Sequence, residues 1–138
     1  MKSQENIFID TGAWVALADK DDDCHHRAVS VYPSLLKSCK RLVTSNLVLA
    51  ESYVLVLHAL GHTTAMSFLE KIHASPRILK IYSNEEIETD AKDILMKYTD
   101  QDFSYTDAVS FAIMRMQQIE KVFCFDKHFL TAGFVRIP

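Results

Sequence analysis

Short apolar runs alternate along the chain with longer segments in which apolar residues recur at helical spacing. Several of the short runs are almost continuously apolar and rich in Ile, Val and Phe, which is typical of strands that are covered on both faces in a parallel sheet. Five strands are predicted from these runs, at residues 7–9, 42–44, 78–81, 122–125 and 134–137.

Helices are predicted between these strands. They span residues 11–19, 25–39, 46–60, 63–74, 85–98 and 104–119, with a short further segment at 127–131. Pro33 should kink or split the second helix, because proline removes a backbone donor. The segments from Ser83 to Glu86 and from Ser104 to Asp107 are interpreted as capping boxes that start the fifth and sixth helices.

This alternation predicts an α/β fold with a central, mainly parallel five-stranded sheet, flanked by helices on both faces. The chain has 138 residues, of which 49% are hydrophobic and 24% charged, so a single domain over residues 1–138 is expected. The net charge of −3 does not suit a protein that coats duplex DNA. It is compatible with a carboxylate pocket that binds a metal ion.

No segment of the sequence predicts a membrane association. Residues 1–6 lead into only three apolar residues, which is unlike a signal peptide. The densest apolar run, residues 47–60, contains Glu51 and is too short and too polar to span a bilayer. The three cysteines are odd in number and lack paired spacing, which favours reduced thiols and a cytoplasmic location.

Two acidic residues follow predicted strands. Asp10 comes directly after residues 7–9, and Asp126 directly after residues 122–125. Sites in open α/β sheets form outside the carboxyl ends of the strands, so both acids are candidates for such a site. Each acid could instead cap the helical segment that follows it.

Two further acids, Glu51 and Asp107, lie in predicted helices. Glu51 is the only charged residue between Leu47 and Leu57, in a helix that is apolar on almost every face. Such a helix is normally buried, and a buried carboxylate needs a partner or a metal, although a solvated edge is the alternative. Asp107 could complete the capping box with Ser104, or face a site at the helix start.

Together, these acids could converge at one edge of the sheet. Close carboxylates repel each other, and Mg²⁺ or Mn²⁺ relieves this because both prefer carboxylate and water oxygens. Such an ion can generate hydroxide, orient a phosphodiester and stabilise the leaving oxygen. The metal ligands and catalytic residues are therefore predicted to be Asp10, Glu51, Asp107 and Asp126, with Glu51 or Asp107 also helping to position the attacking water.

At these residues the chain resembles the PIN-domain family and, in size and layout, its toxin-like VapC group. The matching segments are, in order, residues 8–11, 45–51, 103–108 and 125–129. The resemblance implies a metal-dependent ribonuclease that uses Mg²⁺ or Mn²⁺ to hydrolyse phosphodiester bonds of single-stranded or structured RNA, with the four acids as its pocket. It also implies homodimers and, for a toxin of a toxin–antitoxin pair, a small antitoxin protein that blocks the site.

Residues beside the acids receive weaker assignments. Thr11 and Thr106 could support the metal shell or a phosphate through their hydroxyls, and Asp102 is a possible auxiliary acid that fits a solvated loop better. Cys24, His25 and His26 lack a second pair of ligands at zinc spacing and are interpreted as a helix start. Surface charge is the interpretation for Arg115, Lys127 and His128, and core or dimer surface for Phe111, Met114 and Met116.

Other functions remain open from the residues alone. An RNA-processing nuclease without an antitoxin fits the same pattern, and so does a non-catalytic PIN-like module that binds RNA or protein, although the complete acidic set argues against the latter. A haloacid-dehalogenase-type phosphatase would need a second Asp at the position of Gly12. A receiver domain would need an acid at the end of residues 78–81, and none stands there.

Overall fold

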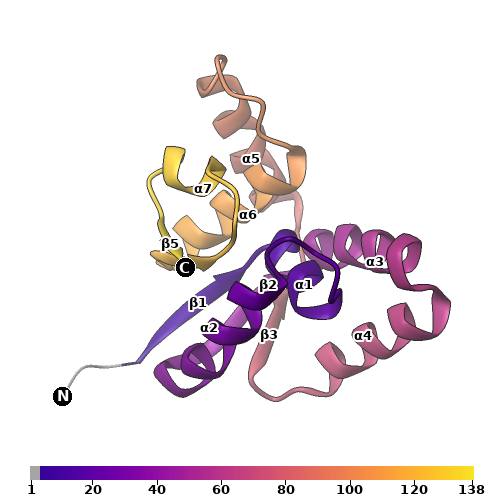
Figure 1. Cartoon of the computed structure of the whole chain (residues 1–138). Coiled ribbons are helices and arrows are strands. Elements are labelled where there is room, and N and C mark those ends of the chain that lie inside the picture. The colour runs from indigo at the N-terminus through magenta and orange to yellow at the C-terminus, as the bar shows by residue number, and fades with distance from the viewer. Residues whose placement is uncertain (1–3) are drawn as a thin grey trace.

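The central sheet consists of five parallel strands in the order β3-β2-β1-β4-β5, in a computed structural model that describes residues 4–138 (Figure 1). The strands are β1 (Glu5–Ile9), β2 (Cys39–Ser45), β3 (Ile78–Ile81), β4 (Lys121–Phe123) and β5 (Val135–Ile137). The predicted α/β class and parallel five-stranded sheet are confirmed. Residues 1–3, part of the segment considered for a signal peptide, lie outside the described residues.

The helices fall where the sequence predicts them. They are α1 (Thr11–Ala18), α2 (His25–Ser38), α3 (Asn46–Leu60), α4 (His62–Ala74), α5 (Glu85–Lys97), α6 (Tyr105–Met116) and α7 (His128–Thr131). Of the predicted kink or split at Pro33, the split does not occur, since α2 is one helix with Pro33 inside it. Val29, four residues before the proline, is exposed, so water can reach the carbonyl that loses its donor.

The start of α5 differs from the predicted capping box. Asn84 is the N-cap, and its side chain accepts a hydrogen bond of 2.9 Å from the backbone N–H of Ile87. The third helical residue is therefore Ile87, which cannot return the hydrogen bond of a capping box. At α6 the predicted box is present, because Ser104 and Asp107 bond each other's backbone N–H groups.

The strand order places helices on both faces of the sheet. The connections β1 to β2 to β3 run in one direction, and those from β3 to β4 to β5 run in the other, so right-handed crossovers put α1–α4 and α5–α7 on opposite faces. Aromatic contacts follow this division: Trp14 of α1 meets Phe68 of α4, whereas Phe111 of α6 meets Phe129 of α7.

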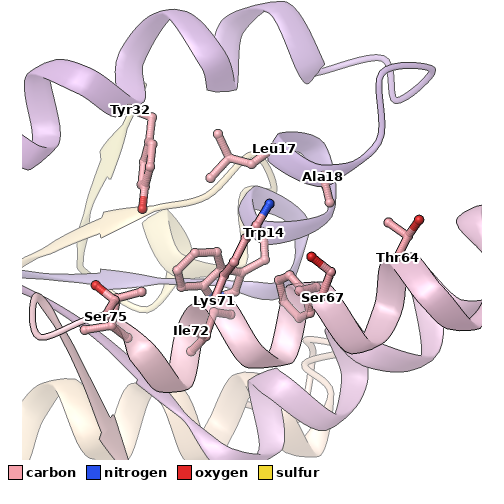
Figure 2. Close-up of a pocket in the computed structure, with 11 residues that line it drawn as sticks. Trp14, Leu17, Ala18, Tyr32, Thr64, Ser67, Lys71, Ile72 and Ser75 are labelled. Atoms are coloured by element: carbon pink, nitrogen blue, oxygen red, sulfur yellow. The ribbon is translucent and has the colours of Figure 1, made fainter.

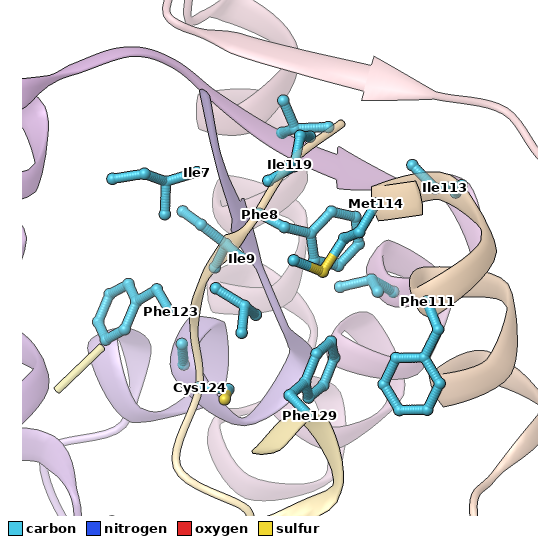
Figure 3. Close-up of a cluster of buried hydrophobic side chains, with 14 of the residues drawn as sticks. Ile7, Phe8, Ile9, Phe111, Ile113, Met114, Ile119, Phe123, Cys124 and Phe129 are labelled. Carbon is cyan, nitrogen blue, oxygen red and sulfur yellow. The ribbon is translucent and has the colours of Figure 1, made fainter. Parts of the chain in front are cut away.

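The core has two layers that meet at β1. Phe8 is fully buried and lies on the side of Phe111 and Met114 of α6, whereas Ile7 lies on the other side of the strand (Figure 3). This is the two-residue alternation of a strand that is covered on both faces. Trp14 Nε1 donates to the buried Thr44 Oγ1 at 3.3 Å, which ties α1 to β2 beneath the end of β1.

Across residues 4–138, none of the helices combines the length and the apolar character that crossing a membrane requires. The predicted absence of a membrane span in residues 47–60 agrees with this finding. That segment forms α3, whose side chains at Val54 and Leu55 are nevertheless about half exposed, at 48% and 47%.

The cap of α5 provides a test of the assigned helix start. We expect Asn84→Ala to lower the free energy of unfolding by about 1 kcal/mol, because the N–H of Ile87 loses its acceptor. Glu86→Gln, within the segment predicted to be a capping box, should cost clearly less. Chemical denaturation of both variants measures the difference, and a larger loss in the Glu86 variant would contradict the assignment.

Candidate metal centre

The candidate site lies between β1 and β4, where the order in which the chain adds strands to the sheet reverses. In the strand order, β1 leads to β2 on one side and pairs with β4 on the other, and the carboxyl ends of two such strands border the crevice in which open α/β sheets bind ligands. The backbone N–H of Asp10 donates to the carbonyl of Phe123 at 3.1 Å and so continues the pairing past the last residue of β1. Asp10 directly follows β1 and is buried.

The carboxylate of Asp10 is not used as a helix cap. Asp10 occupies the N-cap position of α1, but its side chain makes no capping hydrogen bond with that helix. The alternative interpretation of Asp10 as a simple cap is therefore not supported. Its carboxylate remains available for a ligand.

Asp126 lies in a loop and not directly after a strand as predicted. Strand β4 ends at Phe123, although the N–H of Cys124 still bonds the carbonyl of Ile137 at 3.0 Å. Arg136 of β5 donates to the carbonyls of Phe125 and Asp126, at 3.4 and 3.2 Å, and holds the loop against the sheet. The carboxylate of Asp126 accepts a 3.0 Å hydrogen bond from the N–H of His128, so it also caps α7.

Asp107 serves both of the roles that the sequence left open. It completes the capping box with Ser104, and its buried carboxylate also faces Asp126 and His128. One potential ligand atom from each of Asp107, Asp126 and His128 lies within 4.8 Å of the other two. The start of α6 and the loop after β4 thus bring two predicted site residues together.

His128 belongs to this cluster although the sequence interpretation treated it as surface charge. Its Nδ1 lies 2.9 Å from Oδ2 of Asp107. The available signal was its position two residues after Asp126, at the start of a predicted short helix, where a side chain can turn back toward the preceding acid. Lys127, between them, is exposed.

The burial predicted for Glu51 is wrong. Helix α3 buries Val48, Ser52 and Val56, whereas Glu51 is exposed on its other side. The apolar residues Val54 and Leu55 are also exposed, and they made the helix look apolar all round. Glu51 remains close enough that its charge contributes to raising the pKa of Asp10.

The two predicted supporting threonines have different surroundings. Thr11 is buried, and its Oγ1 finds no hydrogen-bond partner among residues 4–138. A buried hydroxyl without a partner is costly, so Oγ1 is suited to a ligand in the crevice. Thr106 is half-buried and lines, with Glu51, an open hollow of about 590 Å³ beside α3. Asp102 is exposed.

Electrostatic repulsion is concentrated on Asp10. Burial, followed by the charge of Asp126, raises its pKa to about 8, and Asp107 and Glu51 add to the shift, while the N–H of Thr11 opposes it. Desolvation and the charge of Asp107 also raise the pKa of Asp126. Negative charge from Asp126 and Asp107 therefore acts on the buried carboxyl of Asp10.

The donor set fits a hard divalent cation. Carboxylate oxygens from Asp10, Asp107 and Asp126, with the hydroxyl of Thr11, are the oxygen ligands that Mg²⁺ and Mn²⁺ prefer. The charges of Asp126, Asp107 and Glu51 contribute to the raised pKa of Asp10, and the charge of Asp107 contributes to the raised pKa of Asp126. Glu51 acts from an exposed position and not from a buried helix face.

A hollow beside α5 is also lined by carboxylates, those of Glu86, Asp90 and Asp93, but these residues are exposed and do not belong to the cluster of potential metal ligands. A hollow of about 400 Å³ between α1, α2 and α4 is walled by aromatic residues such as Trp14 and Tyr32, with Lys71 as its cation (Figure 2). It contains no carboxylate and is not a cation site. Nδ1 of His25 lies 2.7 Å from the carbonyl of Ala16, which agrees with the interpretation of Cys24, His25 and His26 as a helix start.

The structure is that of an α/β domain with a cluster of carboxylates and a histidine at the switch point of its sheet. Residues 7–135 match the PIN domain family. The chain belongs to the PIN domain family, as the four sequence motifs predicted.

Two similar proteins carry names that describe an activity or an assembly. The 23S rRNA-specific endonuclease VapC20 of Mycobacterium tuberculosis is 32% identical over 131 residues, which are 95% of this chain and 97% of VapC20. Its crystal structure, described as that of a Sarcin-Ricin loop cleaving toxin, has a TM-score of 0.88 at 31% identity and covers 95% of this chain and 98% of that one. These similarities support the predicted VapC-like group.

FitAcB from Neisseria gonorrhoeae shares the fold at lower similarity. Its structure has a TM-score of 0.65 at 18% identity and covers 96% of each chain. At that identity the similarity shows the fold alone.

The raised pKa of Asp10 gives a prediction about stability. The pKa of Asp10 is about 8 in the folded protein and ordinarily 3.8, so between these pH values the folded protein binds a proton that the unfolded chain does not. The metal-free protein therefore loses stability as the pH rises through this window. We expect Asp10→Asn to raise the unfolding temperature of the metal-free protein by several degrees at pH 8, because a pKa unit corresponds to about 1.4 kcal/mol.

The gain should shrink toward pH 4, where Asp10 is neutral in the folded protein. Mn²⁺ at pH 8 should reverse the order, stabilising the unmodified protein more than the variant. Asp93→Asn on α5 is the control and should show neither effect. Thermal scans in EDTA and in Mn²⁺ measure both, and an Asp10→Asn gain that is equal at pH 4 and pH 8 would contradict the assigned cause.

Proposed function

We propose that this protein is a metal-dependent endoribonuclease of the VapC-like toxin group, with Asp10, Asp107 and Asp126 as its metal ligands and Glu51 at the edge of the site. The observation that carries the proposal is the cluster of Asp107, Asp126 and His128 together with the buried Asp10, whose pKa is raised to about 8 by its burial first and then by the charges of its acidic neighbours. At neutral pH Asp10 otherwise holds a proton, and a bound cation would favour its ionised form.

Asp10, Asp107 and Asp126 would hold Mg²⁺ or Mn²⁺, which when bound would supply the positive charge that activates water and neutralises the phosphodiester. The protein's own groups position the reactants. Asp107 and Asp126 are held by hydrogen bonds from Ser104 and His128, so their oxygens are fixed before substrate arrives. Thr11 Oγ1, which lacks a partner among residues 4–138, can donate to a phosphate oxygen or to water in the pocket.

Glu51 is suited to take the proton from the attacking water. It is exposed, and its charge acts on Asp10, so it reaches the pocket from the solvent side. Asp107 is less suited to this task because its Oδ2 already accepts two hydrogen bonds. Glu51 thus serves as general base, while the three aspartates hold the metal.

The substrate proposed is a structured loop of ribosomal RNA. VapC20 is named as an endonuclease specific for 23S rRNA, and this chain matches it over 95% of its length. Cleavage of the sarcin–ricin loop is therefore the first substrate to test. We further propose a cytoplasmic location, as the RNA substrate and the predicted reduced thiols require.

Two protein partners belong to the same proposal. A small antitoxin protein would block the acidic pocket, as the VapC-like relationship supports. A homodimer is supported by the exposed apolar side chains of Val54 and Leu55 on α3, which are costly to leave in water.

Cleavage of labelled RNA tests the function directly. We expect a hairpin with the sarcin–ricin loop sequence to be cut at one position with Mg²⁺ or Mn²⁺ and to remain intact in EDTA. Asp107→Asn should reduce the rate by roughly a hundredfold or more, because it removes a ligand charge. Product mapping on a gel, beside an unstructured RNA of the same length, measures both rate and specificity.

The matched control is Asp93→Asn on α5, which removes an equal charge outside the pocket and should keep full activity. If the folded protein binds the hairpin tightly but cuts no RNA with either metal, the nuclease proposal fails and the non-catalytic binding module replaces it. Cleavage that persists in EDTA would also contradict it.

A further inference from the structure

The two oxygens of the Asp107 carboxylate have different surroundings. Oδ2 accepts the N–H of Ser104 at 3.1 Å and lies 2.9 Å from Nδ1 of His128. No residue within 4–138 donates a hydrogen bond to Oδ1. A carboxylate with one oxygen occupied by two donors offers its other oxygen to a metal ion.

The His128 ring is held by contacts on more than one side. Its backbone N–H donates to Oδ1 of Asp126 at 3.0 Å, which fixes the start of α7 against the acidic loop. The ring also meets the edge of Phe103, with centroids 5.4 Å apart at an interplanar angle of 73°. Phe103 in turn packs on the fully buried Phe111 of α6. Rotation of the imidazole away from Asp107 would disrupt these contacts.

The direction of the hydrogen bond follows from the partners. An ionised carboxylate only accepts hydrogen bonds, so a 2.9 Å contact with Asp107 Oδ2 requires the proton on Nδ1. With that proton in place, Nδ1 has no lone pair for a metal ion. The geometry therefore favours His128 as a donor to Asp107 over direct ligation through the same nitrogen.

We infer that His128 is a positioning residue of the metal centre, which donates from Nδ1 to Asp107 Oδ2, directs Oδ1 to the metal and through its backbone N–H holds Asp126 in the same cluster. The inference deepens the proposed function and rests on the metal-dependent reaction described above. It assigns a role to a residue that neither the acidic pattern nor the family match identifies.

The test is the affinity of the full chain for Mn²⁺, measured by calorimetry without RNA. His128→Leu keeps the size of the side chain but removes the donor, and we expect it to weaken Mn²⁺ binding roughly tenfold or more. His128→Asn places an amide N–H where Nδ1 stands and should bind within about threefold of the unmodified protein. His128→Gln, whose amide lies one methylene further out, should behave like the Leu variant.

A double-variant cycle separates positioning from general loss of structure. In an Asp107→Asn background, His128→Leu should have little further effect on Mn²⁺ affinity, because the oxygen that it positions is gone. A ligand or a merely structural residue would add its own loss in that background. Thermal unfolding of each variant verifies that the fold is intact.

Metal preference distinguishes a donor from a ligand. Imidazole nitrogen favours Co²⁺ over Mn²⁺ more than carboxylate oxygen does. If His128 only donates, the ratio of Co²⁺ to Mn²⁺ affinities should be unchanged in His128→Asn. A fall in this ratio, or equal losses in the Asn and Leu variants, would overturn the inference.

RNA cleavage is measured separately so that the two proposals can fail separately. The Mn²⁺ affinities of the unmodified protein and its His128 variants could follow the expected order while the unmodified protein cuts no RNA. That result would support the role of His128 and contradict the nuclease proposal. If the unmodified protein cuts RNA but all His128 variants bind Mn²⁺ as tightly as it does, the nuclease proposal is supported and the role of His128 is contradicted. Absence of Mn²⁺ binding in the unmodified protein would overturn both.

Discussion

The parallel pairing of β1 with β4 is the constraint on which the site depends. It continues beyond the strand through the hydrogen bond from the N–H of Asp10 to the carbonyl of Phe123. This bond fixes the base of the crevice, while Arg136 of the next strand holds the loop that carries Asp126. Because β1 is covered by helices on both faces, the sheet edge cannot move without disturbing the core, and the acids stay close together.

The closeness of the acids lowers the stability of the metal-free fold and at the same time favours the binding of a metal ion. The metal-free fold must either protonate the buried Asp10 or keep its charge near those of Asp126 and Asp107, and the rise of its pKa to about 8 reflects first this burial and then these charges. The apolar layers around Phe8 and Phe111 provide the stabilisation that tolerates this cost. Such strain is useful because it favours the metal-bound state, in which the same charges attract the ion.

Most of the fold could be predicted from the sequence because its signals are local and repeated. Two examples are the apolar runs of Ile, Val and Phe that form the strands and the capping box of Ser104 and Asp107. Each of these signals spans only a few neighbouring residues. The exposure of Glu51 could not be predicted, because the sequence does not show that Val54 and Leu55 on the same helix are also exposed. The contact between His128 and Asp107 depends on the packing of α7 against α6, which joins residues far apart in the sequence.

The four acids differ in how firmly they are held, and this difference separates their roles. Asp107 is fixed by two donors to one oxygen and Asp126 by the N–H of His128, so both are suited to a permanent metal platform. Asp10 has no capping bond and is buried, which makes it the group that benefits most from the ion. Glu51 is exposed and can adjust when RNA arrives. A platform of fixed carboxylates with one movable acid at its edge can bind metal before substrate and still move a proton during the reaction.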